Sequence, residues 1–144
     1  MARNTLKLDT TGFESMLAKL DSLGGNVKEA VQEALTKAGE TISRDTIAAL
    51  DSANLPDGGH FSKGDTRAAV ITDAQVRWEG LTAYIPVGFD FSKPGAGGFL
   101  ITGTPRMRPD AALSKMYKQK SYMNQIQKDI SNIILDYVIE AMQR

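Results

Sequence analysis

The sequence predicts one α+β domain over residues 1–144, in which a small antiparallel sheet packs against a long helix and a C-terminal helix. The sheet is expected to hold a hairpin plus short strands. The chain has 144 residues, 42% of them hydrophobic, which is the size and composition of a single globular domain. Two long stretches carry apolar residues at helical spacing, and the stretch between them alternates apolar and polar residues. Strands that follow one another in sequence favour an antiparallel sheet with helices on one face.

The N-terminal region predicts a short strand and then a helix. Residues 4–9 alternate apolar and polar side chains, as a strand does. Thr11 and Glu14 have the spacing of a capping box at a helix start. The apolar residues that follow recur at helical spacing: Phe13, Met16, Leu17, Leu20 and Leu23. Gly24 and Gly25 are expected to end this helix, because glycine adopts the left-handed conformation without steric cost.

A second, long helix is expected directly afterwards. Asn26 is a suitable N-cap residue, and Glu29 follows three residues later. Its narrow apolar stripe is rich in alanine: Val27, Ala30, Val31, Ala34, Leu35, Ala38, Ile42, Ala49 and Leu50. The helix should reach about Ala53, since Pro56 disfavours helical geometry in the residue before it.

The next region predicts a flexible loop and a β-hairpin. The loop covers about 56–65 and contains three glycines and a proline. Apolar residues of one parity then run from Ala68 to Trp78, and a second alternating stretch spans 81–87. Because Pro86 has no N–H to donate, the second strand is expected to be an edge there or to be ending. The apolar face of the hairpin should pack on the long helix.

The C-terminal third predicts a second flexible loop, a short strand and two helices. The loop covers about 88–98; it is rich in glycine but lacks the Gly-Lys-Ser/Thr ending of a phosphate-binding loop. Residues 99–101 form a short apolar strand candidate, and Pro109 can open a short helix. The expected inner positions of that helix are Ala111, Ala112, Leu113 and Met116. The last helix has a continuous apolar stripe: Met123, Ile126, Ile130, Ile133, Ile134, Tyr137, Val138 and Ala141.

The composition excludes several chemistries. The chain has no cysteine and one histidine, which excludes disulfides, thiolate metal sites and multi-histidine zinc sites. His60 lies among Asp57, Ser62 and Asp65, but a catalytic triad needs a rigidly held base, and this loop is flanked by glycines. We therefore expect no enzyme, no catalytic residues, no metal and no cofactor. No apolar run is long enough for a transmembrane helix, and the N-terminus lacks a secretory signal.

Charge is balanced overall, with seventeen basic and seventeen acidic side chains, but it is unevenly distributed. Residues 1–58 carry six Lys/Arg and nine Asp/Glu, a net of −3, whereas 104–144 carry seven and four, a net of +3. Much of the basic excess lies in one stretch: Arg106, Arg108, Lys115, Lys118 and Lys120. Two interpretations remain open. These residues form an ordinary solvated surface, or they form a basic patch for an acidic partner or a nucleic-acid backbone.

Three segments carry a resemblance to a known family. The first is the opening order of a short strand, a helix bearing Gly12-Phe13 and a long alanine-rich helix. The second is 64–70 (Gly-Asp-Thr-Arg-Ala-Ala-Val), and the third is 98–104 (Gly-Phe-Leu-Ile-Thr-Gly-Thr) with Arg-Met-Arg-Pro following. With this order of elements the chain resembles the tail-completion, or head–tail joining, proteins of long-tailed bacteriophages. It departs from the family pattern at Arg67, where a glycine is expected, and at Ile101-Thr102, where an acidic residue is often found.

The resemblance implies a structural virion protein at the neck, made in the cytoplasm of the bacterial host. Such subunits form a homo-oligomeric ring between the connector and the tail tube, touch the neighbouring stopper, terminator or tube proteins, and let double-stranded DNA pass without sequence preference. Neither an enzymatic activity nor a membrane partner is implied.

Several residues are candidates for contacts in such a ring. Those expected to touch neighbouring subunits or partners are Phe89, Phe91, Lys93, Phe99, Arg106 and Arg108. Those expected to meet a partner or the DNA channel are Arg106, Arg108, Lys115, Lys118 and Lys120. For the two phenylalanines of the second loop a packed position in the core is the alternative.

Three other functions remain open. One is a tail terminator or minor capsid protein. Another is a small nucleic-acid-binding module that uses the basic stretch and stacks bases on Trp78 or Tyr84, although Trp78 shares parity with the apolar strand face. The last and weakest is an enzyme built on His60.

Overall fold

The computed structural model has the predicted α+β architecture. It describes residues 5–8, 14–53, 55, 62–79, 82–106 and 108–143. The elements in these residues, in chain order, are β1 (Thr5–Leu8), α1 (Glu14–Ser22), α2 (Val27–Ser52), α3 (Lys63–Ala68), β2 (Arg77–Glu79), β3 (Thr82–Pro86), α4 (Gly97–Thr102), α5 (Ala111–Lys118) and α6 (Lys120–Met142). The predicted capping residue Thr11, the tip of the predicted hairpin and most of the first predicted loop lie outside the described residues.

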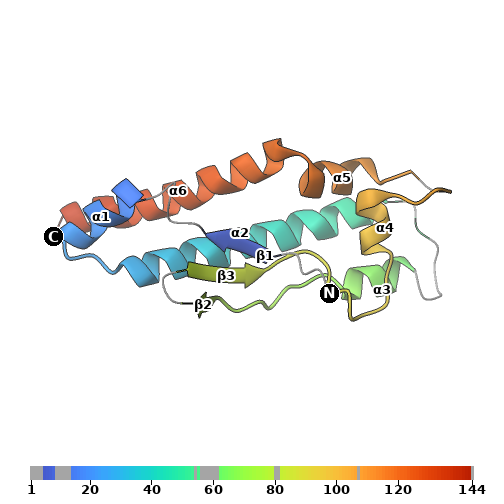
Figure 1. The fold of residues 1–144 in the computed structure, drawn as a ribbon, viewed down its shortest axis with the longest axis horizontal. Coiled ribbons are helices and arrows are strands. Elements are labelled where there is room, and N and C mark those ends of the chain that lie inside the picture. The colour runs from blue at the N-terminus through green and yellow to red at the C-terminus, as the bar shows by residue number, and fades with distance from the viewer. Residues whose placement is uncertain are drawn as a thin grey trace.

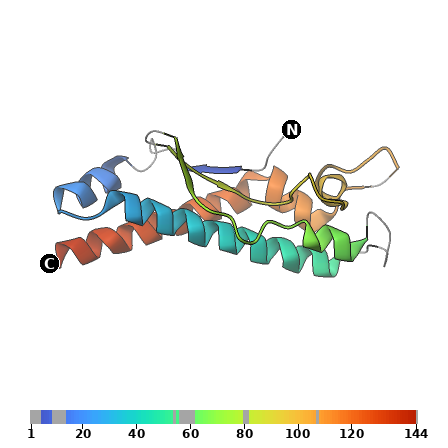
Figure 2. The same ribbon diagram turned by 90° about the horizontal axis from the view of Figure 1, so that it is seen from below.

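Two long helices and a small sheet form the body of the molecule. Helices α2 and α6 run antiparallel and contact each other along much of their length (Figure 1). The three-stranded antiparallel sheet has the order β1-β3-β2 and covers one side of this helix pair (Figure 2). Helix α1 lies at one end of the elongated molecule, beside the end of α6, and the short helices α3, α4 and α5 lie at the other end (Figure 1).

Helix α2 begins and ends as the sequence predicts. The side chain of Asn26 accepts a hydrogen bond from the backbone N–H of Glu29, at 3.1 Å, and satisfies one of the free amides of the first turn. The preceding helix α1 ends at Ser22, and Gly24 follows with a φ of 77°. Small side chains on α2 let other elements approach closely. A Cβ atom on Gly39 would lie 2.9 Å from Cδ1 of Ile85 in the sheet.

The core is divided into three clusters along the long axis. The central cluster joins α2, β3 and α6 through fully buried residues such as Leu35, Ile85 and Ile130. One outer cluster lies under α1 and consists of Leu20, Ala30, Val138 and Ala141. The other lies at the end that carries α3, α4 and α5, and it consists of Ala49, Leu50, Ala69, Val70, Phe89, Ala96, Leu100, Ile101, Leu113 and Met116.

Strand β3 has the alternation that the sequence predicts, with Ala83 and Ile85 buried and their neighbours half-buried. Its apolar face packs on α2, as expected. The strand is central in the sheet, but Pro86 pairs only with Thr5 of β1 and β3 ends there, so the expectation of an edge or an end at this residue is confirmed.

The first strand of the predicted hairpin is much shorter than expected. Residues 63–68 form helix α3, which Ser62 caps by accepting the N–H of Asp65 at 3.1 Å, and only Arg77–Glu79 form strand β2. The prediction of a flexible loop up to residue 65 and of a strand from Ala68 is therefore corrected. A side chain that caps a helix competes with strand formation at the same residues.

Pro86 gives the physical reason for the interrupted pairing. Val70 pairs with Phe89, and Arg77 pairs with Tyr84. Between these two pairs the chain advances by seven residues on the Val70–Arg77 side and by five on the Tyr84–Phe89 side, so the longer side bulges by two extra residues. The Gly88 carbonyl and the Asp90 N–H bond to the backbone of 69–71. Because backbone groups alternate in direction along a strand, the nitrogen of Pro86 faces the same neighbouring segment as Gly88 and Asp90 do. Proline has no N–H to donate to that segment, so the ladder is interrupted.

Residues 99–101 belong to helix α4 and not to a strand, which corrects the prediction. In a strand Leu100 and Ile101 would point to opposite faces, whereas in the helix both are buried. The second predicted loop is packed at several points. The backbone of Gly97 lies against the ring of Phe89, and the N–H of Ala96 donates to Thr66 Oγ1 at 2.9 Å. The prediction that the whole of 88–98 is a flexible loop is therefore wrong for these packed residues.

The C-terminal helices follow the prediction closely. Asp110 caps α5 by accepting the N–H of Leu113 at 3.1 Å, directly after Pro109. Leu113 and Met116 are buried as expected, but the predicted inner positions Ala111 and Ala112 are exposed. Helix α6 buries one stripe of residues: Ile126, Ile130, Ile134, Val138 and Ala141.

Candidate functional site

The candidate residues gather at the end of the molecule that carries α4 and α5. We call this surface the basic end, and it consists of Phe91, Lys93, Phe99, Arg106, Arg108, Lys115, Lys118 and Lys120. A backbone hydrogen bond of 2.7 Å from the N–H of Asp110 to the carbonyl of Leu100 closes the turn between α4 and α5. This bond holds the turn that carries Arg106 and Arg108 beside α4 and its Phe99.

The basic end carries an excess of positive charge. All six of its Lys and Arg side chains are exposed. The ion pairs among the described residues join Lys37 to Glu33, Arg44 to Asp45, and Arg67 to Asp51, so none of the six takes part in one. The acidic residue nearest in sequence, Asp110, has its carboxylate engaged in capping α5. Six cations without fixed counterions attract an anionic surface at short range.

The two phenylalanines of the 88–98 segment have different positions. Phe89 is 3% exposed, its ring centroid lies 6.3 Å from that of Tyr117, and it belongs to the core. The expectation that Phe89 contacts a neighbouring subunit is therefore wrong, and the alternative, a packed position, is confirmed. Phe91 is 42% exposed and Phe99 is 45% exposed. Exposed aromatic side chains among cations are typical of a surface that binds another macromolecule.

Two tyrosines fix this end of the molecule to α2. The only hydroxyl proton of Thr46 donates to the carbonyl of Ile42, so the hydroxyl of Tyr117 donates to Thr46 Oγ1 at 2.6 Å. Tyr122 donates to the carboxylate of Asp45 at 2.8 Å. Burial raises the pKa of both tyrosines, and for Tyr122 the nearby Asp45 carboxylate raises the pKa further. Both stay protonated donors at neutral pH, so α5 and the start of α6 are held in place.

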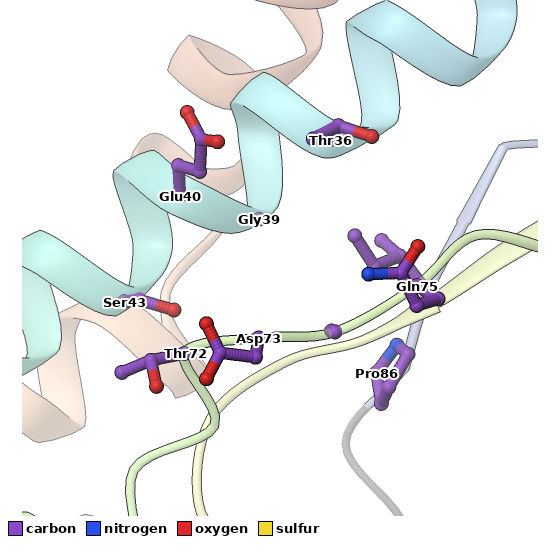
Figure 3. Close-up of a pocket in the computed structure, with 10 residues that line it drawn as sticks. Thr36, Gly39, Glu40, Ser43, Thr72, Asp73, Gln75 and Pro86 are labelled. Atoms are coloured by element: carbon purple, nitrogen blue, oxygen red, sulfur yellow. The ribbon is translucent and has the colours of Figure 1, made fainter.

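A small pocket lies between α2 and the bulged segment 72–75, away from the basic end. It has a volume of about 170 Å³ and is lined by Thr36, Gly39, Glu40, Ser43, Thr72, Asp73, Ala74, Gln75, Ile85 and Pro86. The hydroxyl of Ser43 donates to the carbonyl of Ile71 and is therefore engaged. In Figure 3 the carboxylate of Asp73 lies near Ser43, whereas that of Glu40 projects away from the bulged segment. Among the described residues no three His, Cys, Asp or Glu side chains are grouped as metal ligands.

Two further residues that the sequence suggested as candidates, His60 and Trp78, are not among those that define the basic end. His60 lies outside the described residues. Trp78 is half-buried against the central cluster, and the ammonium of Lys28 lies 5.4 Å from its ring centroid. This position makes Trp78 a poor platform for stacking bases.

The sequence reasoning missed one exposed apolar group, on the outer side of α6. Leu135, Ile139 and Met142 are 45%, 45% and 61% exposed. Their spacing of four and three residues differs in phase from the buried stripe, and this second helical phase is the signal that could have found them.

Comparison of the chain with protein-family models, with curated proteins and with solved structures found no significant match. Within the described part of the chain, none of the helices combines the length and the apolar character that crossing a membrane requires.

Proposed function

We propose that the chain is a structural virion protein of a tailed bacteriophage, a tail-completion or head–tail joining subunit. In this role copies of the chain form a ring between the connector and the tail tube, and DNA passes through the ring. The protein then resides at the neck of the virion and performs no catalysis. The resemblance of three sequence segments to this family suggests the role.

The observation that carries the proposal is the basic end. Its six exposed cations lie at the same end of the molecule as Phe91 and Phe99, which are large, apolar and exposed. A subunit of an assembly needs such a surface, because apolar contact supplies affinity and charge supplies orientation. The same cations suit the phosphate backbone of passing DNA, which they would bind without reading sequence.

Deletion of the gene from the phage or prophage that encodes it tests the role. Negative-stain electron microscopy of the lysate should show filled heads and finished tails lying apart. Tails of irregular length would indicate a tail terminator instead. Intact particles with normal infectivity would refute a neck role.

A charge reversal at the basic end tests the assigned surface. The variant Arg106→Glu/Arg108→Glu should lower the plaque-forming titre at least about tenfold, because like charges across an interface cost enough free energy for such a factor. Its thermal unfolding should match that of the natural protein, since both side chains are exposed. The control Lys19→Glu/Arg77→Glu changes the same charge at exposed positions on α1 and β2. An unchanged titre for the first variant would remove Arg106 and Arg108 from the site.

A small nucleic-acid-binding module is the second candidate, and the six cations at one end favour it. The isolated protein would then shift double-stranded DNA in a gel, and affinity would fall steeply with salt. The neutral total charge and the packing of half-buried Trp78 against the central cluster weigh against this candidate.

A further inference from the structure

A second exposed surface lies at the other end of the molecule, on the outer side of α6. Leu135, Ile139 and Met142 succeed one another by four and three residues and therefore form one line along the helix. The inner side of the same turns is already used, because Val138 and Ala141 are buried against α1 and α2. Exposed residues of this size in a row are unusual on a helix that packs only within its own domain.

Five carboxylates lie on the same turns of α6 and on the neighbouring turns of α2, close to Tyr137 and Lys37. The acidic side chains are Glu29, Glu33, Glu40, Asp136 and Glu140, and Lys37 is the cation among them. The hydroxyl of Tyr137 donates to Glu33, which raises the pKa of Tyr137 to about 12 and lowers the pKa of Glu33. Glu33 is therefore ionised at neutral pH. We call the five carboxylates together with Leu135, Ile139 and Met142 the acidic face.

The acidic face and the basic end are complementary in two respects. The first has five carboxylates and one lysine, and the second has six cations. Each also presents large exposed apolar side chains, Phe91 and Phe99 at one end and Leu135, Ile139 and Met142 at the other. The two surfaces lie toward opposite ends of one elongated chain (Figure 1), so one copy cannot close them on itself.

We propose that the acidic face of one copy binds the basic end of a second copy, head to tail. The proposal deepens the proposed function and rests on it for its biological setting, since a ring needs two different surfaces on each subunit. A two-fold contact centred on either surface would place that surface against itself and bring like charges together. A two-fold pair that sets each basic end against the other acidic face would stop at two copies. A head-to-tail contact pairs opposite charges and continues from copy to copy, which gives a closed ring when the rotation fits.

Disulfide trapping tests this contact directly, because the natural chain has no cysteine. Phe99→Cys and Ile139→Cys each place one thiol in one of the two surfaces. Under mild oxidation the mixture of the two single variants should form a disulfide-linked heterodimer, and neither variant alone should form a dimer. A chain that carries both substitutions should give a ladder of covalent oligomers on a non-reducing gel.

A matched control places the cysteine elsewhere on α6, outside the acidic face. Gln127→Cys is exposed, lies two turns before Leu135 and should not pair with Phe99→Cys. Cross-linking of Phe99→Cys with itself, of Ile139→Cys with itself, or equally with Gln127→Cys would overturn the head-to-tail contact. So would the absence of any heterodimer in a concentrated mixture.

A charge exchange gives a second readout that does not depend on cysteine geometry. The variants Arg106→Glu/Arg108→Glu and Asp136→Lys/Glu140→Lys, each combined with the paired cysteines, should each lose the ladder. Mixing the two variants should restore cross-linking, because each reversed surface then meets a reversed partner. Loss in both single variants without restoration in the mixture would overturn the proposed pairing.

The trapping experiment and the gene deletion fail independently. A heterodimer together with intact virions in the deletion lysate would keep the head-to-tail contact and refute the neck role. Separated heads and tails without any heterodimer would keep the neck role and refute this contact.

Discussion

The two ends of the molecule are built in different ways. At the end that carries α1, three helices meet through repeated burial of small and medium apolar residues: Leu20, Ala30, Val138 and Ala141. At the other end three short helices are held by individual contacts. Thr66 accepts the N–H of Ala96, the backbone of Gly97 lies against Phe89, and Tyr117 donates to Thr46.

This difference determines how each end should respond to substitution. Where many similar contacts hold two helices together, one substitution removes only one of them. The long helices keep their internal hydrogen bonds when that contact is lost. Helices of six to eight residues such as α3, α4 and α5 are too short to form alone, so each depends on the residues that anchor it. The end that carries the basic surface should therefore be the more sensitive one.

The largest effect is expected from the anchor of α5. Leu113→Ala should lower the free energy of unfolding by about 2–5 kcal/mol, because Leu113 is 0% exposed and its removal leaves a cavity. Leu135→Ala is a matched control on α6, where the leucine is 45% exposed, and should change the free energy by less than about 0.5 kcal/mol. Urea denaturation measures both, and equal effects would contradict the assigned core.

The second-largest effect on stability is expected at Gly97 in α4, where the backbone lies close to another side chain. A Cβ atom at Gly97 would lie 2.4 Å from Cγ of Phe89, so Gly97→Ala forces the ring out of place and should cost about 1–3 kcal/mol. In Gly64→Ala the new Cβ has 3.9 Å to its nearest neighbour, inside helix α3, and the change should stabilise by up to about 1 kcal/mol. Opposite signs in thermal melts of the two variants are the test.

The tyrosine anchor on α2 should give a smaller effect. Thr46→Val keeps the shape of this buried side chain but leaves the half-buried Tyr117 hydroxyl without its acceptor, at a cost of about 1–2 kcal/mol. The double variant with Tyr117→Phe should recover part of this loss, since the hydroxyl that needs a partner is gone. A double-mutant cycle in urea with no coupling would show that this bond does not hold the two elements together.

The smallest effect is expected at the α1 end, where Tyr137 bonds Glu33 on the surface. Tyr137→Phe should raise the Glu33 pKa toward the ordinary 4.5, because the hydrogen bond that lowers it most is lost. A lowered folded-state pKa contributes stability above the unfolded value and loses it as pH falls through the folded value. The natural protein should therefore lose more stability below about pH 4.5 than the variant does. Carboxyl NMR titration that finds an unchanged Glu33 pKa would contradict this pairing.

The same hydrogen bond makes stability depend on pH in the alkaline range as well. Because it raises the pKa of Tyr137 to about 12, the protonated hydroxyl contributes its full stabilisation below the ordinary tyrosine pKa of 10.0. That contribution is lost as pH rises through about 12. Tyr137→Phe removes this alkaline dependence.

Much of the fold follows from local patterns in the chain. Asn26 caps α2 as its side chain predicts, Gly24 follows the end of α1, and α6 buries the stripe that its spacing indicates. A helix of more than twenty residues repeats its signal over many turns, so a single ambiguous position does not alter the prediction. The family resemblance and the ring it implies stay predictions.

The short helices and strands could not be predicted from local patterns in the same way. Residues 99–101 are an apolar run of three that fits a strand and a helix equally, and the helix forms because both Leu100 and Ile101 are buried there. The strand expected from Ala68 starts only at Arg77, since Ser62 caps a helix and Pro86 cannot complete the ladder. Both outcomes depend on residues distant in sequence.

The sequence by itself determined the fold class, the two long helices, the N-cap of α2, strand β3 and the basic stretch, because each depends on neighbours within a few turns. Only the tertiary structure decided that Phe89 is buried while Phe91 and Phe99 are exposed, and that the glycines near 97 serve close packing. It alone also placed the cations at one end and five carboxylates with an apolar line toward the other. Burial and surface charge are properties of elements packed together, and a linear pattern fixes them only where one element is long enough to have a single inner side.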